Sequence, residues 1–89
     1  MSVKVTLHPY LTEGGGEAQV ELEGKSVGEC LKNLVGRFPA MQSKLFAKNE
    51  KLHGYVEILV NAQPTVPLEL AYPLKDGDEM AILVFLSGG

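Results

Sequence analysis

The last residues of the sequence, Ser87, Gly88 and Gly89, are the first candidates for chemistry. Glycine has no Cβ and adopts either sign of φ, so a Gly-Gly segment can enter a channel too narrow for other residues. The carboxylate of Gly89 could therefore reach the catalytic centre of another enzyme. Transfer of AMP from ATP would convert this poor electrophile into a mixed anhydride, which a sulfur or nitrogen nucleophile can attack. The alternative is a frayed chain end without a role.

Cys30 and the two histidines do not form a catalytic or metal-binding set. Cys30 falls on the apolar side of an expected helix, beside Leu31, which favours a packed thiol over a nucleophile. His8 and His53 are far apart in the sequence, and neither has a cysteine or a second histidine close by. We therefore expect no catalytic residue and no metal site in this chain.

The segment Gly24-Lys25-Ser26 is similar to the end of a phosphate-binding loop. That motif needs a further glycine five residues earlier, where this sequence has Gln19. Ser26 is better explained as a helix cap, because Glu29 follows it by three residues and completes a capping box. We expect no nucleotide or other cofactor to be bound by this chain.

The composition narrows the class of protein. Eighty-nine residues leave room for one domain. A single cysteine excludes an internal disulfide and a four-cysteine metal site. The net charge of −3 argues against a nucleic-acid partner. No apolar run approaches the roughly 20 residues that cross a bilayer, and no signal peptide begins the sequence, so we expect a cytoplasmic protein without a membrane partner.

Hydrophobic periodicity predicts the first half of the fold. Residues 3–7 and 18–23 alternate between apolar and polar side chains, which is typical of two half-buried strands joined as a β-hairpin. Between Val27 and Phe38, apolar residues recur at helical spacing and predict one amphipathic helix, which Pro39 ends.

The second half contains shorter signals and one long apolar run. Residues 41–46 indicate a weak helical turn, 55–60 a strand, and 68–70 an edge strand. The last run, 80–86, is apolar at every position and does not alternate. A strand of this kind lies in the middle of a sheet, either covered on both faces or with one face open to a partner.

These elements predict an α+β fold in which a mixed sheet of four or five strands carries one main helix on one face. The last strand is expected to be central. Met80 and Ile82 should face the helix, while Ala81, Leu83 and Phe85 should face a partner. Acidic side chains near the start of this strand would form a rim that speeds encounter with a basic partner. They are Asp76, Asp78 and Glu79.

The hairpin, the capped helix and three later segments together resemble the MoaD/ThiS sulfur-carrier family of ubiquitin-like β-grasp proteins, to which archaeal small modifier and CysO-like proteins look similar. The three later segments carry the most specific part of the resemblance. They are the strand from Ile58 to Asn61, the Leu-Lys-Asp-Gly-Asp-Glu turn at 74–79, and the apolar strand before Gly88 and Gly89. The resemblance covers essentially the whole chain and implies one β-grasp domain over 1–89 with a flexible Gly-Gly tail. Many relatives have a Pro-Pro pair shortly before the tail, whereas this chain has Val84-Phe85.

The resemblance also implies a function. In this family an activating enzyme of the ubiquitin-activating type uses ATP to adenylate the C-terminal glycine, here Gly89, with Gly88 as its flexible neighbour. The terminus becomes a thiocarboxylate that donates sulfur, with molybdopterin synthesis the favoured pathway and the large subunit of molybdopterin synthase, or another sulfur acceptor, as partner. A modifier joined to lysines and a non-covalent β-grasp binding module are the alternatives. In each case the chain is expected to be a monomer on its own and not an enzyme.

Overall fold

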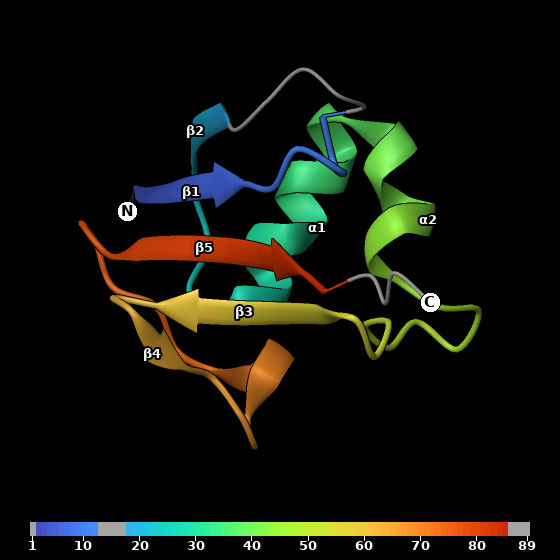
Figure 1. Cartoon of the computed structure of the whole chain (residues 1–89). Coiled ribbons are helices and arrows are strands. Elements are labelled where there is room, and N and C mark those ends of the chain that lie inside the picture. The colour runs from blue at the N-terminus through green and yellow to red at the C-terminus, as the bar shows by residue number, and fades with distance from the viewer. Residues whose placement is uncertain (1, 13–17, 86–89) are drawn as a thin grey trace.

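The computed structural model describes residues 2–12 and 18–85, and Figure 1 shows the arrangement of their elements. The described residues form five strands and two α-helices. They are β1 (Val3–Leu7), β2 (Ala18–Leu22), α1 (Val27–Arg37), α2 (Gln42–Leu45), β3 (Val56–Val60), β4 (Gln63–Pro64) and β5 (Glu79–Val84), with short 3-10 helices at Pro39–Met41 and Glu69–Ala71.

The strands form one mixed sheet in the order β2-β1-β5-β3-β4. β5 runs parallel to β1, where Val5 lies opposite Met80, and antiparallel to β3, where Ile58 lies opposite Ile82. β1 and β2 form the expected antiparallel pair. The prediction that the last strand is central is therefore confirmed, and the α+β class with it.

The start of α1 has the expected cap. The Ser26 hydroxyl accepts a hydrogen bond from the backbone N–H of Glu29 at 3.2 Å. The Glu29 carboxylate accepts one from the N–H of Lys25, one residue before the position that a standard capping box uses. At the other end, Phe38 leaves helical geometry and its N–H is donated to the Leu34 carbonyl. The helix thus ends at Arg37, one residue earlier than the sequence predicts, and Phe38 lies between the helix and Pro39.

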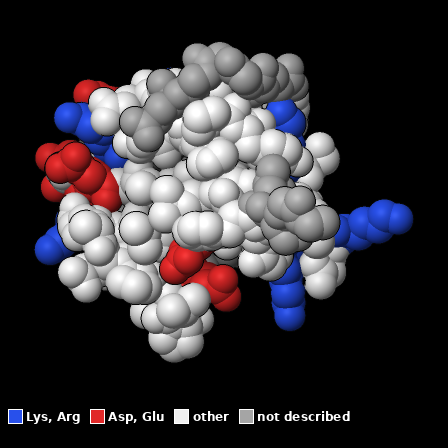
Figure 2. Space-filling model, viewed as in Figure 1, with Lys and Arg blue, Asp and Glu red and all other residues white. Residues whose placement is uncertain are grey.

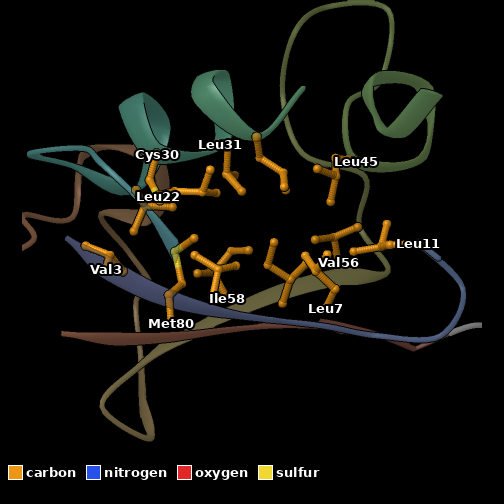
Figure 3. Close-up of a cluster of buried hydrophobic side chains, with 14 of the residues drawn as sticks. Val3, Leu7, Leu11, Leu22, Cys30, Leu31, Leu45, Val56, Ile58 and Met80 are labelled. Atoms are coloured by element: carbon orange, nitrogen blue, oxygen red, sulfur yellow. The ribbon is translucent and has the colours of Figure 1, made fainter. Parts of the chain in front are cut away.

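The hydrophobic core fills the layer between the sheet and the two helices (Figure 3). Leu31 and Leu34 from α1 are fully buried, and Met80 and Ile82 of β5 are 1% exposed. The two β5 residues therefore face the helix, as expected. Leu45 of α2 is also fully buried and closes the core at the end where β3 begins.

Three details differ from the sequence prediction. Residues 68–70 do not form an edge strand, because the chain turns there into the 3-10 helix at Glu69–Ala71. The edge strand next to β3 is β4. Phe38 is not part of the helix face and is 36% exposed. β5 begins at Glu79 and ends at Val84, so the apolar strand is shorter than the run of apolar residues.

A polar bracket made of Asn61 and Asp78 fixes the start of β5. One Asp78 carboxylate oxygen accepts from the Asn61 amide at 3.0 Å, and the other accepts from the N–H of Lys75 at 2.7 Å. The Asn61 side chain in turn accepts from the N–H of Glu79. The hydrogen bond from Asn61 is the main cause that lowers the pKa of Asp78, and the Lys75 N–H adds to it.

The turn before β5 contains a glycine in the left-handed backbone conformation. Gly77 has a φ of 87° in the turn before β5, a conformation that strains residues with a Cβ. Its N–H donates to the carbonyl of Ser2, which ties the turn to the start of β1. The motif residues of this turn therefore hold β1, β3 and β5 in register.

Within the part of the chain that the structure describes, no helix has the length and apolar character needed to cross a membrane.

Shortening Leu34 should destabilise the protein strongly. The Leu34→Ala change leaves a cavity between α1 and the sheet, and we expect the free energy of unfolding to fall by about 2–5 kcal/mol. Urea denaturation followed by circular dichroism measures it. The exposed Lys32→Ala change on the same helix is the control. A loss at Leu34 under about 0.5 kcal/mol would place this residue outside the core.

Replacing Asp78 with asparagine should destabilise the protein at neutral pH. An amide has only one acceptor oxygen, so either the Asn61 amide or the N–H of Lys75 loses its acceptor and faces an NH2 donor. We expect the free energy of unfolding to fall by about 1–3 kcal/mol at pH 7. The pKa of Asp78 in the folded chain lies below its ordinary value of 3.8. The stability that the carboxylate gives the parent chain is therefore complete above about pH 4, and it disappears as the pH falls through the folded pKa.

The matched control for this prediction is Asp76→Asn. The amide oxygen of the new side chain can still accept the hydrogen bond that the N–H of Ser2 now donates to Asp76. Unfolding curves at several pH values should therefore show the pH-dependent loss for the Asp78 variant alone. A gap between wild type and the Asp78 variant that stays constant down to pH 2 would contradict the role of the carboxylate.

Candidate functional site

The tail residues, Gly88 and Gly89, lie outside the described residues, but the structure shows where the chain departs from the sheet. β5 ends at Val84, so the first residue of the Val-Phe pair is still part of the strand. The N–H of Phe85 donates to the carbonyl of Tyr55 at 2.7 Å, which extends the pairing with the β3 side by one residue. Phe85 itself is 60% exposed. The four residues that follow are thus attached directly to the central strand.

Tyr55, whose carbonyl accepts from Phe85, belongs to a group of ring side chains. The rings of His53 and Tyr55 stack with centroids 4.7 Å apart, and Tyr10 meets Tyr55 edge to face at 6.4 Å. The Lys44 ammonium lies over the Tyr10 ring and donates to the Tyr10 carbonyl at 3.1 Å. Burial, and then a hydrogen bond with Tyr10, raises the pKa of Tyr55. These residues come from three separate segments, so sequence spacing could not have grouped them.

The face of the sheet away from the helices is open and mostly uncharged. Ala81 and Leu83 of β5 are half-buried there, in contrast to the buried Met80 and Ile82. Figure 2 shows this face with a broad uncharged area over β1 and β5, and with acidic side chains beside the start of β5. The predicted division of β5 into a helix-facing and an open side is therefore what the structure contains.

Neighbouring strands complete this open face. Thr6 of β1 and Leu59 of β3 lie on either side of Ala81 in the sheet register, and Glu57 lies beside Leu83. The sequence analysis did not select these residues. The alternation in β3, where Val56, Ile58 and Val60 are buried and the two between them are not, was the signal that could have identified Leu59 and Glu57.

The acidic rim is smaller than expected. Asp76 and Glu79 are exposed, but Asp78 is only 7% exposed and both of its carboxylate oxygens are used within the fold. Lys4 lies opposite Glu79 in the register of β1 and β5. Two carboxylates, not three, therefore remain at the surface, one of them next to a lysine. Asp78 belongs to the framework that supports the site.

The remaining candidates for chemistry have structural roles. Cys30 is fully buried under α1, and burial, with a smaller effect of Glu29, raises its pKa to about 11. At neutral pH it is a protonated, enclosed thiol, which confirms the prediction of a packed cysteine. The ring nitrogen Nδ1 of His8 accepts from the N–H of Tyr10. Among the described residues no cluster of His, Cys, Asp and Glu could hold a metal ion.

The described residues therefore contain an open sheet face and a central strand that the chain leaves at Phe85. The open face, defined here by Thr6, Leu59, Ala81, Leu83 and Phe85, lies directly beside the point where the tail begins.

Comparison with known proteins places the chain among small β-grasp proteins. Small archaeal modifier protein 1 from Haloferax volcanii is 31% identical over 77 residues, 85% of each chain. The solution structure of small archaeal modifier protein 1 from Methanosarcina acetivorans superimposes with a TM-score of 0.85 at 34% identity, covering 99% of this chain and 96% of that one. A chain of the BexX/CysO complex from Amycolatopsis orientalis gives 0.81 at 31% identity, covering 98% and 99%.

The family model reaches the end of the sequence. The model of the ThiS family matches residues 3–89, so it includes all five strands and both terminal glycines. The strand order β2-β1-β5-β3-β4 with α1 across one face is that of the ubiquitin-like β-grasp fold. The chain belongs to the ThiS family and has a ubiquitin-like β-grasp fold.

Proposed function

We propose that this chain is a sulfur carrier that is activated at the Gly89 carboxylate and acts as the co-substrate of an adenylating enzyme. The observation that carries the proposal is the match to the ThiS family through residue 89, together with a Gly-Gly end that follows the central strand. Molybdopterin synthesis is the favoured destination of the sulfur.

The proposed chemistry proceeds in two steps on the partner enzyme. The Gly89 carboxylate attacks the α-phosphorus of ATP and pyrophosphate leaves, which gives an acyl-adenylate. Hydrosulfide, or an equivalent sulfur nucleophile, then attacks the acyl carbon and AMP leaves, which gives the thiocarboxylate. This chain supplies the carboxylate and its position, whereas the partner supplies ATP and the groups that stabilise the developing charges.

The open face of the sheet is the proposed docking surface for the activating enzyme or for the sulfur acceptor. Leu83, Ala81 and Phe85 offer apolar area next to the chain end, and the exposed Asp76 and Glu79 add negative charge at the start of β5. Charged groups at the rim of an interface chiefly speed encounter, so a partner with basic residues around an apolar patch fits this face. Protein complexes occur among the relatives, as in the BexX/CysO structure.

A ubiquitin-like modifier is the second candidate, because the archaeal relatives are named small modifier proteins. In this function the lysine amine of a target attacks the same acyl-adenylate, or a thioester formed from it, and an isopeptide bond results. Both candidates need the same activation of Gly89. They differ in product, since a carrier ends as a thiocarboxylate of the same chain length and a modifier ends in conjugates of higher mass.

Deleting Gly89 should abolish activation without changing stability. The deletion removes one residue, so the carboxylate moves by up to about 3.5 Å from the position where it meets ATP. Displacements of about 1 Å can already reduce rates roughly a hundredfold. ATP–pyrophosphate exchange with the cognate activating enzyme measures the activation. A chain extended by one alanine should fail in the same assay.

The thermal midpoints of both tail variants should equal that of the parent chain, because the core residues within the described part of the chain form a continuous cluster without any contribution from Gly89. This control separates loss of activation from loss of folding. Normal pyrophosphate exchange by the Gly89 deletion would contradict the carrier and the modifier function together.

A negative charge at Leu83 should prevent docking. The Leu83→Asp change places a carboxylate in the middle of the open face, and we expect binding of the activating enzyme to weaken about 30-fold or more, as for a central interface residue. Leu68→Asp is the control, because it is the same change at a leucine that is 53% exposed and lies beside the 3-10 helix at Glu69–Ala71, whereas Leu83 is half-buried on the open face. Titration calorimetry gives both affinities.

Circular dichroism of the Leu83 variant should match that of the parent chain. If the enzyme binds the Leu83 variant as tightly as it binds the Leu68 variant, the docking surface lies elsewhere on the molecule.

A further inference from the structure

Glu57 places a carboxylate on the open side of the sheet, at the end where β3 begins and β5 ends. It lies directly opposite Leu83 in the antiparallel pairing of β3 with β5, so the two side chains are on the same face of the sheet. Both are half-buried. This carboxylate is therefore beside the apolar side chains of the open face, whereas Asp76 and Glu79 are exposed at the start of β5.

The other charges that the strands carry on this side of the sheet have opposite charges next to them. Lys4 of β1 lies between Glu21 of β2 and Glu79 of β5 in the register of the sheet. The next row across the sheet is uncharged, and in it the Gln19 amide donates to the Thr6 hydroxyl at 3.3 Å. Opposite charges on neighbouring strands attract each other. Charge at the end of the sheet where β5 begins is therefore largely compensated within the chain.

Glu57 has no such compensation among the described residues. It forms no hydrogen bond or ion pair with any of them. Its neighbours on the same side of β3, Tyr55 and Leu59, are uncharged, as is the residue opposite it on β5. Lys44, which lies near this end of the sheet, is directed at Tyr10, whose carbonyl and ring it contacts. The Glu57 carboxylate is thus a half-buried charge without a counter-charge in the described part of the chain.

A protein that docks on the open face has to cover this carboxylate. Side chains directly opposite each other in an antiparallel pair have Cβ atoms about 5 Å apart, so a contact with Leu83 removes water from Glu57 as well. A carboxylate that loses water without gaining a counter-charge opposes association, whereas one that meets a cation is compensated. The position of Glu57 therefore sets a requirement on the surface of the partner.

From these observations we propose that the activating enzyme presents a cationic side chain to Glu57, within the apolar contact around Leu83, and that this pair selects the enzyme that docks. The inference rests on the proposed function, because it concerns the docking surface of that function. The exposed Asp76 and Glu79 chiefly speed encounter, whereas a charge pair enclosed in the interface determines how long the complex lasts and which partner fits. Glu57 is thus a specificity-determining residue and not a catalytic one.

Two uncharged substitutions separate this pairing from purely apolar docking. If no cation meets Glu57, the Glu57→Leu change enlarges the apolar area and removes an unpaired charge, so the activating enzyme would bind more tightly. If a cation does meet it, the change encloses that cation without a partner, and binding weakens. We expect Glu57→Leu and Glu57→Gln both to weaken binding about 30-fold or more in titration calorimetry.

A conservative variant and a rim variant are the controls. Glu57→Asp keeps the charge on a shorter side chain, so it should bind more tightly than Glu57→Gln, although glutamine is closer in size to glutamate. Glu79→Gln removes an exposed charge and should weaken binding only a few-fold, an effect that disappears in about 0.5 M salt. The effect at Glu57 should persist in that salt, because an enclosed pair is screened less. Circular dichroism and the thermal midpoint of each variant should match those of the parent chain.

ATP–pyrophosphate exchange gives a second measurement on the same variants. The Glu57→Leu and Glu57→Gln changes should raise the KM for this chain and leave kcat unchanged, since the side chain acts on docking and not on the activated carboxylate. A lower kcat at an unchanged KM would contradict a role in docking.

The outcomes distinguish this inference from the proposed function. Equal or tighter binding of the Glu57→Leu variant, with normal exchange by the parent chain, would overturn the inference and leave the proposed function intact. If the parent chain binds the enzyme but supports no exchange, the proposed function fails, and the affinities of the Glu57 variants still decide whether a cation meets this residue. A parent chain that the enzyme does not bind at all would overturn both.

Discussion

The parallel pairing of β5 with β1 is the contact on which the rest of the structure depends. It joins the two ends of the described chain and places the last strand at the centre of the sheet, where it also pairs with β3. A strand in this position has neighbours on both edges, so its end is held firmly. Phe85, the last residue that the structure describes, consequently follows the most constrained strand of the sheet.

The helices cover only one face of the sheet, so the side chains that stabilise the fold and those that remain open lie on opposite faces. Side chains of β5 that face α1 belong to the core, whereas Ala81 and Leu83 face outward beside the chain end. The bracket of Asn61 and Asp78 serves the first purpose, because it fixes where β5 begins and which side chains face in. A one-residue slip of β5 would exchange its two faces. The carboxylate of Asp78 thus helps to determine which side chains of β5 form the open face without being part of that face.

The sequence allowed prediction of the features that depend on strong local signals. The helical spacing from Val27, the cap at Ser26 and the unbroken apolar run of the last strand led to the correct helix and central strand. Features that depend on tertiary contacts were missed or wrong. Asp78 looked like a surface acid because its partner Asn61 is distant in sequence, and residues 68–70 looked like a strand although the chain turns there. The position of Glu57 beside Leu83 arises from strands that meet only in the folded chain.

The central claim is that the Gly89 carboxylate is the reactive group of this protein. Intact mass spectrometry of the full chain, after incubation with its activating enzyme, ATP and a sulfur source, tests it most directly. The account predicts a mass gain equal to the replacement of one oxygen atom by sulfur, located by fragmentation at Gly89 and absent from the Gly89 deletion. An unchanged mass in a reaction where the enzyme activates another substrate, or the same gain at a residue other than Gly89, would contradict it.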